Sequence, residues 1–291
     1  MPSADRRTSR LDPRIYQITV LASLLIYGVL ALDFEVRFEV ATVIMITALI
    51  SQWSCTRLWR LPRFDPRSPL ISALSLCLLL RTDVLALAAL AAVITIASKF
   101  IIRARGKHVF NPTNFGLAAM MLVSDRVWVS PGQWGSAAFF GFLLACLGGL
   151  VVHRAARSDV TYAFLVAYAA VLFGRAAWLG DPLVIPLHQL ESGALLIFAF
   201  FMISDPKTTP DSRLGRLVYA ALVAALAGGL RFAFYQPNAL IWALVACAPV
   251  VPLIDRLLPG ERYRWRQIGS ARAAHRASPH FDTLRPAHDP T

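Results

Sequence analysis

The chain has 291 residues, of which 57% are apolar and only 16% are charged, and its mean hydropathy is +0.56. This composition excludes a soluble domain with a polar surface and indicates an integral membrane protein. The formal net charge of +12 does not indicate a nucleic-acid-binding module. The arginines stand between apolar runs, whereas such a module needs a basic face with interleaved aromatic residues.

Apolar stretches predict about ten membrane helices. In chain order they are expected near residues 15–33, 39–56, 68–80, 84–101, 112–124, 135–153, 160–178, 190–204, 215–234 and 238–256. The first stretch is long and lacks a small-residue cleavage pattern, so no cleavable signal peptide is expected.

The basic residues predict the orientation of these helices. If the N-terminal arginines are cytoplasmic, 24 of the 29 lysines and arginines fall on the cytoplasmic side. The remaining five are Arg37, Arg81, Arg126, Arg175 and Arg231. This asymmetry follows the positive-inside rule and predicts that both termini are cytoplasmic, in the plasma (inner) membrane of a bacterium. The expected organisation is a basic N-terminus at 1–14, a membrane domain at 15–256 and a basic, disordered tail at 257–291.

Five plus five helices predict two inverted repeats, near 15–124 and 135–256, because an odd number of spans inverts the second half. The third and eighth helices occupy matching positions and are both short, at 68–80 and 192–204. Each would be about 20 Å long, against a hydrocarbon core of about 30 Å. Two short helices at matching positions indicate a central site.

Two polar strings, at 107–116 and 200–210, adjoin these apolar spans. Because polar groups at membrane depth usually line a site, both strings are where function is sought. The candidate ligand-binding residues are Lys99, His108, Asn111, Asn114, Asp205 and Thr208.

Each candidate also has an ordinary structural explanation. Asn111 can cap the helix that starts at Pro112, and Thr208 can cap a later helix. Lys99 can extend to the membrane interface, or it can pair with Asp205 or hold an anionic ligand. Asp205 can be a turn residue paired with a nearby base, and His108 can be solvated.

Four segments occur in register on this ten-helix frame: 69–74 (Pro-Leu-Ile-Ser-Ala-Leu), 110–116 (Phe-Asn-Pro-Thr-Asn-Phe-Gly), 192–206 and 252–256 (Pro-Leu-Ile-Asp-Arg). With them the membrane core resembles the RnfD/NqrB family. This family comprises the RnfD protein of the Rnf electron-transport complex and the NqrB protein of the sodium-translocating NADH:quinone oxidoreductase. The resemblance implies ten helices in two inverted repeats, flavin-based electron transfer coupled to ion movement, and companion redox or membrane subunits.

The chain departs from this family where larger members carry FMN on a threonine. The corresponding loop, 124–136, contains no threonine, and the Ser-Gly-Ala string at 192–194 continues with Leu195. Covalent FMN is therefore not expected. A noncovalent flavin (riboflavin or FMN) or a quinone-like ligand between the short helices is expected instead.

Haem and iron–sulfur clusters are not expected either. The six histidines lie near span ends or in the tail, and the four cysteines are single and scattered. No metal-ligand spacing occurs in the sequence.

The predicted function is a membrane subunit of a flavin- or quinone-linked electron-transport system, with or without coupling to cation translocation. Such a chain would be a component of a membrane oxidoreductase complex rather than an enzyme alone. One alternative is a small-solute transporter or channel-like protein on the same scaffold. Another is a structural or maturation partner in a specialised biosynthetic cluster.

Overall fold

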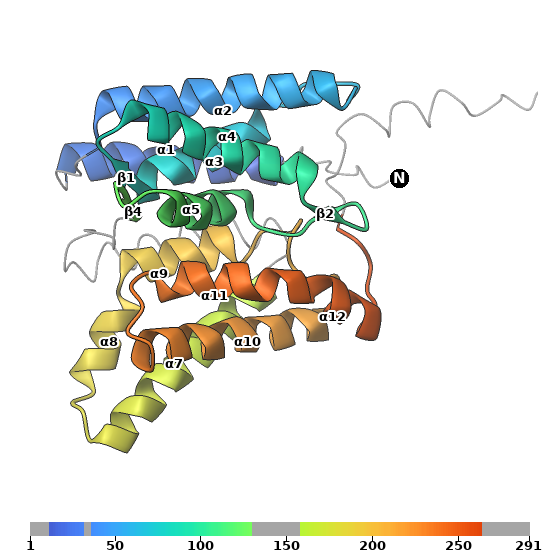
Figure 1. Cartoon of the computed structure of the whole chain (residues 1–291). Coiled ribbons are helices and arrows are strands. Elements are labelled where there is room, and N and C mark those ends of the chain that lie inside the picture. Colours follow the sequence, from blue (N-terminus) through green and yellow to red (C-terminus); the bar gives the residue numbers. More distant parts are fainter. Residues whose placement is uncertain (1–11, 32–35, 130–157, 264–291) are drawn as a thin grey trace, which may run out of the picture.

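The helices of this chain form two stacked groups, one from each half of the sequence. The fold is taken from a computed structural model that describes residues 12–31, 36–129 and 158–263. In Figure 1 the group from α1 to α5 lies above the group from α7 to α12, with α5 facing α9 and α11 between the layers. The regular structure in these ranges is almost entirely helical, which confirms the expected all-α membrane class.

The first group holds five helices. They are α1 (Pro13–Ala31), α2 (Phe38–Leu58), α3 (Arg67–Leu79), α4 (Leu85–Ile101) and α5 (Pro112–Val123). The α4 and α5 helices pack closely because Gly116 has no side chain. A Cβ atom at this position would lie 1.8 Å from Thr95 Oγ1.

The second group is more irregular. It holds α7 (Ser158–Leu179), α8 (Val184–Leu190), α9 (Gly193–Ile197), the π-helical turn η1 (Phe198–Met202), α10 (Arg213–Phe232), α11 (Ala239–Cys247), the 3₁₀ turn η2 (Ala248–Val250) and α12 (Val251–Leu257). The η2 turn interrupts the last span because Pro249 and Pro252 supply no N–H group for an α-helical hydrogen bond. No proline explains η1, where the Ile203 N–H donates to the Phe198 carbonyl five residues back, 3.0 Å away.

Two short antiparallel strand pairs join elements of the first group. Strand β1 (Leu80–Thr82) pairs with β4 (Val127–Val129), with Leu80 opposite Val129. Strand β2 (Arg103–Ala104) pairs with β3 (Lys107–His108), with Arg103 opposite His108. The two residues between β2 and β3 both have positive φ angles, of 51° and 79°, which is typical of a type I′ hairpin turn.

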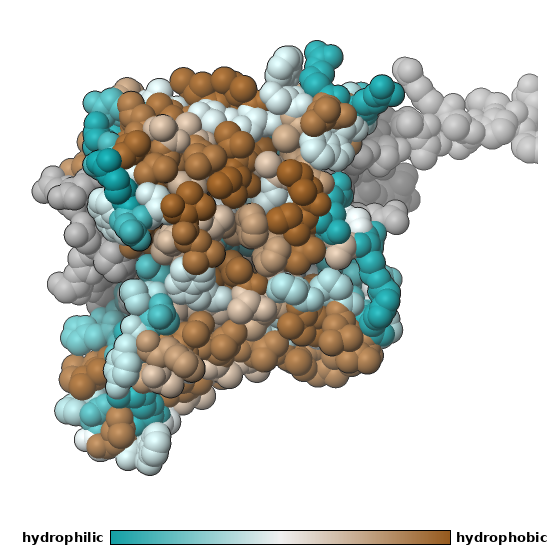
Figure 2. Space-filling model, in the orientation of Figure 1, coloured by the Kyte–Doolittle hydropathy of each residue, from teal (hydrophilic) through white to brown (hydrophobic). Residues whose placement is uncertain are grey.

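The surface suits a lipid environment. Five described stretches, α1, α2, α7, α10 and 239–257, are long and apolar enough to cross a membrane. The α8 helix and the α9–η1 segment form a sixth candidate, which is bent by 49° at the residues between them. Figure 2 shows apolar side chains over the middle of the visible face and hydrophilic ones gathered at the two ends of the helices.

The observed helices agree with most of the expected positions. The α3 helix has 13 residues, and α9 and η1 have five each, so the expected third and eighth helices are both short. The α8 helix lies where no separate helix was expected. The stretch 135–153 lies outside the described residues, and the arrangement as two inverted five-helix repeats stays a prediction.

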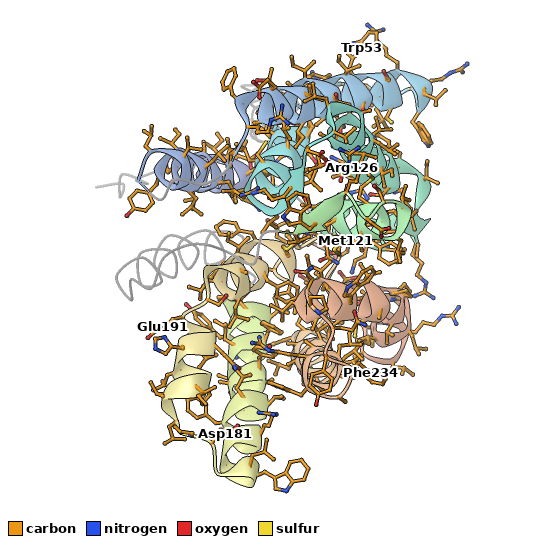
Figure 3. All side chains as sticks on the ribbon, turned by 60° about the vertical axis from the view of Figure 1, so that its left-hand side comes forward. Trp53, Met121, Arg126, Asp181, Glu191 and Phe234 are labelled. Carbon is orange, nitrogen blue, oxygen red and sulfur yellow. The ribbon has the colours of Figure 1, made fainter. Side chains whose placement is uncertain are left out.

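The interface between the two groups runs along α5. Figure 3 places Met121 of α5 between the groups, whereas Trp53 and Asp181 lie at their outer ends. The Asn238 side-chain amide, just before α11, approaches Met121 Sδ at 3.7 Å. Side chains from both halves of the chain therefore meet near α5.

Candidate functional site

A polar cavity of about 160 Å³ lies where the first turns of α1, α3 and α5 meet η1 and the segment after it. We call it the polar cavity. Its lining includes Lys99, His108, Asn111 and Asp205, which are four of the six residues expected from the sequence. The other two, Asn114 and Thr208, do not line it, although both are buried close by in the chain.

Asn111 both caps a helix and joins the two groups of helices. Its side-chain oxygen accepts from the Asn114 N–H at 3.0 Å, so it is the N-cap of α5 with Pro112 in the first turn. Its amide nitrogen donates to the Met202 carbonyl at 3.2 Å. The expected capping role is confirmed, and the tie to η1 is an addition that sequence spacing does not reveal.

Asn114 joins α5 to α11. Its side-chain nitrogen donates to the Ile241 carbonyl at 3.1 Å. Its oxygen is buried and has no hydrogen-bond partner among the described residues. Asn114 and Asn111 therefore hold two different carbonyls of the second group rather than sharing one ligand-binding face.

The segment after η1 folds around Asp205. The Asp205 carboxylate accepts from the Lys207 N–H at 2.9 Å, and its main-chain carbonyl accepts from the Thr208 hydroxyl at 3.3 Å. Thr208 therefore closes a turn. The helix cap expected in this segment is supplied by Ser212, whose hydroxyl accepts from the Gly215 N–H at the start of α10.

The π-helical turn is held open by side chains. Thr161 of α7 donates to the Ala199 carbonyl at 2.9 Å, and Ser204 donates to the Phe200 carbonyl at 2.5 Å. Such turns are often found at functional sites because they free main-chain groups from the helical pattern. Here the turn forms one wall of the polar cavity.

His108 lines the polar cavity from strand β3. Burial lowers the pKa of its imidazole to about 4, and the positive charges of Arg103 and Lys99 act in the same direction. The ring is therefore neutral near pH 7. Its Nδ1 atom is buried and without a hydrogen-bond partner among the described residues, so it is not the solvated loop histidine of the alternative interpretation.

Lys99 is buried at the last turn of α4, with 5% of its surface exposed. Its ammonium group donates to Ser68 Oγ at 3.1 Å. Because the Lys99 side chain is buried, it does not extend to the membrane interface as one of its ordinary structural explanations requires.

Sequence reasoning missed an ionic cluster beside the site. Lys107 Nζ lies 3.0 Å from Asp211 Oδ1 and 2.9 Å from Asp255 Oδ2, and it donates to the Thr209 carbonyl at 2.8 Å. This cluster ties β3 of the first group to α12 of the second. All three partners lie more than 100 residues away in the chain, so spacing gives no signal for it.

A second cavity of about 480 Å³ lies at the opposite ends of α3 and the α9–η1 segment. We call it the large cavity. Its lining includes aromatic residues Tyr168, Phe198 and Tyr235, together with polar residues Arg231, Gln236 and Asn238. Arg231 is held in place by the Tyr168 hydroxyl, 3.4 Å from Nη1.

Met202 lines both cavities. The polar cavity and the large cavity are thus separated by the η1 turn, whose Met202 carbonyl is bound by Asn111. Groups of His, Cys, Asp and Glu side chains able to hold a metal ion are absent from the described residues.

Residues 125–264 of this chain match the NQR2, RnfD, RnfE family. The chain is also similar to proteins named as the D subunit of an ion-translocating oxidoreductase complex. It is 35% identical to the Erwinia tasmaniensis protein over 127 residues, which is 42% of this chain and 34% of that protein. It is 36% identical to the Escherichia coli O1:K1 protein over 133 residues, or 45% and 33% of the two chains. The matched region spans about a third of the length of these relatives.

Proposed function

We propose that this chain, whose residues 125–264 match the NQR2, RnfD, RnfE family, is a membrane subunit of a flavin- or quinone-linked electron-transport system. The relatives named above are subunits of an ion-translocating oxidoreductase complex. We accordingly propose companion redox or membrane subunits for this chain, in the inner membrane of a bacterium and with both termini cytoplasmic.

The observation that carries this proposal is the pair of cavities that meet at Met202. Two ligand sites that share a lining residue suit a protein that passes electrons between two bound groups. Their sizes favour different ligands. A closed apolar cavity of about 150 Å³ holds one benzene ring.

The polar cavity, at about 160 Å³, has room for one such ring, and we assign the head group of a quinone-like ligand to it. Phe200 and Phe201 supply apolar walls, while Asn111 and Lys99 supply N–H donors for quinone oxygens. His108 and Asp205 complete the polar side. Asn114 and Thr208 fix the surrounding main chain.

The large cavity, at about 480 Å³, has room for three fused rings, and we assign a noncovalent flavin to it. Tyr168 and Phe198 provide aromatic surface, and Gln236 and Asn238 provide amides for the polar edge of the ring.

The visible spectrum of the purified protein, before and after acid precipitation, tests the flavin assignment. Yellow absorbance released into the supernatant is expected. Filling the large cavity by Ala194→Phe should abolish this absorbance, whereas Ala246→Phe on the exposed face of α11 should leave it unchanged. A protein that stays colourless after incubation with riboflavin and with FMN would refute the assignment.

A second candidate function is the passage of a cation or small solute through the same scaffold. It is favoured by Met202, which lines both cavities. Liposomes containing the Met202→Ala variant should then release a trapped cation or solute faster than liposomes with the unmodified protein. Equal release from both would exclude this route.

A further inference from the structure

We propose that the polar cavity binds a monoanionic ligand built on a single aromatic ring, with the negatively charged oxygen held by Lys99. This inference rests on the proposed single-ring site and adds the charge of its ligand. The ligand class comprises aromatic carboxylates, phenolates and acidic hydroxyquinones.

Lys99 differs from the other buried basic side chains in its partners. Three basic residues are classed as buried in the described part of the chain: Lys99, Lys107 and Arg216. Lys107 contacts two carboxylates, and Arg216 contacts the Asp159 carboxylate at 2.5 and 2.8 Å. Lys99 is the most buried of the three, yet it has no described carboxylate oxygen within 4.0 Å.

Lys99 also makes fewer hydrogen bonds than its ammonium group can donate. An ammonium group has three N–H donors. Lys107 Nζ has three acceptors, whereas Lys99 Nζ has only Ser68 Oγ among the described residues. Because a buried charge is stable only when it is paired and hydrogen-bonded, Lys99 has capacity for an incoming anionic oxygen. The end of the α4 dipole favours a cation at Lys99 but does not use its remaining donors.

The cavity wall carries more positive than negative side chains among the described residues. Arg14, Lys99 and Lys207 line it, and Asp205 is the one described carboxylate in the lining. Arg14 is already engaged by Asp12 and Asp65, at 2.7 Å each. Lys99 and Lys207 therefore face one carboxylate, which leaves one positive charge for a ligand to balance.

The size and lining of the cavity suit a single ring. The cavity holds about 160 Å³, close to the space that one benzene ring occupies. Phe200, Phe201 and Ile71 form its apolar part, while Lys99 and Ser68 form part of its polar lining. A ring with one anionic substituent satisfies both parts, and a bare inorganic anion satisfies only the polar one.

Benzoate and benzamide provide a matched pair of probes, because they share the ring and differ in charge. Binding of each to the unmodified protein in lipid nanodiscs is measured by titration calorimetry and by ligand-observed NMR. Benzoate is expected to bind at least tenfold more tightly than benzamide, a difference of about 1.4 kcal/mol. Equal affinities would overturn the proposal, and this comparison requires no variant to fold.

Three variants locate the charge. Lys99→Met should reduce benzoate affinity to that of benzamide, while Lys99→Arg should retain the preference for benzoate. Arg256→Gln removes an exposed positive charge outside the cavity and should change neither affinity. Loss of the preference in Arg256→Gln, or its persistence in Lys99→Met, would contradict the role of Lys99.

Inorganic phosphate tests the need for a ring. Phosphate should displace benzoate at least tenfold less effectively than a second aromatic carboxylate, salicylate, does. Equal displacement would show a general anion site and refute the ring requirement. None of these probes undergoes redox chemistry, so the anion site is tested independently of electron transfer. If the protein prefers benzoate but binds neither flavin nor quinone, the anion site is supported and the redox function is rejected.

Discussion

The side-chain amide of Asn111 donates a hydrogen bond to the main-chain carbonyl of Met202, 3.2 Å away, and thereby joins the start of α5 to the end of η1. The same side chain caps α5 through the Asn114 N–H. One asparagine therefore sets both a helix start and the position of the wall between the two cavities.

Replacing Asn111 with leucine should lower the free energy of unfolding by about 1–3 kcal/mol. The helix cap contributes about 1 kcal/mol and the buried bond to Met202 contributes the rest. Denaturation followed by intrinsic fluorescence in detergent measures the change. Ser212→Ala removes only a helix cap, at the start of α10, so it should lower the free energy of unfolding by less than Asn111→Leu does. An equal decrease in the two variants would show that the hydrogen bond to Met202 adds no stability.

Asn114→Leu should lower the occupancy of a noncovalent flavin in the large cavity without preventing membrane insertion. The Asn114 amide fixes the Ile241 carbonyl at 3.1 Å, and Ile241 lines that cavity. The ratio of acid-released flavin to protein provides the measurement. Flavin occupancy equal to that of the unmodified protein would show that Asn114 does not contribute to flavin binding.

Lys107→Met should destabilise the protein by about 3–5 kcal/mol, because it leaves the carboxylates of Asp211 and Asp255, each only 11% exposed, together without their cation. Thermal unfolding in detergent, compared with the unmodified protein, gives the change. The exposed neighbour provides the control: Arg256→Gln should alter stability by less than about 0.5 kcal/mol. A small effect of Lys107→Met would mean that the cluster does not tie the two groups together.

Gly116→Ala should destabilise the α4–α5 contact by about 1–3 kcal/mol, since the new Cβ atom would meet Thr95 Oγ1 at 1.8 Å. A Cβ atom added at Gly174 in α7 would have no such neighbour within 4 Å. Gly174→Ala should therefore stabilise its helix, by up to about 1 kcal/mol. Adding Thr95→Ala to Gly116→Ala should restore part of the lost free energy of unfolding. If it restores none, the contact with Thr95 is not the cause of the loss.

The stability of the folded protein should fall as the pH is lowered from about 6.5 toward 4, in part through His108. Burial holds its folded pKa at about 4, below the ordinary value of 6.5, so the unfolded state takes up a proton that the folded state excludes. The stabilisation is complete above pH 6.5 and is lost as the pH falls. His108→Gln should flatten this dependence in unfolding experiments, whereas His188→Gln, at an exposed site, should not.

Most helix positions could be predicted because long apolar runs and helix-start residues are local signals. Asn111 with Pro112 marks the start of α5. The short apolar runs at 68–80 and 192–204 predict that the third and eighth helices are short, as observed. The α8 helix was missed because its seven residues are too few to show periodicity. The η1 turn was missed because the run Phe198–Met202 contains no proline or glycine to mark it.

The candidate site was predicted in part for a different reason. Lys99, His108, Asn111 and Asp205 stand beside apolar spans, and each does line the polar cavity. Their partners are set by tertiary packing across distant parts of the chain, such as Asn111 with Met202 and Lys99 with Ser68. No local pattern encodes such pairs, nor the size of the cavity between them.

The two ends of the molecule differ in how firmly its two groups of helices are fastened. Near the polar cavity the fastening is ionic, through Lys107 with Asp211 and Asp255. Near the large cavity the described side-chain contacts between α5 and the second group are uncharged: Asn114 donates to the Ile241 carbonyl at 3.1 Å, and the Asn238 amide lies 3.7 Å from Met121 Sδ. Salt in the buffer should therefore weaken the contacts between the two groups near Lys107 more than those near the large cavity.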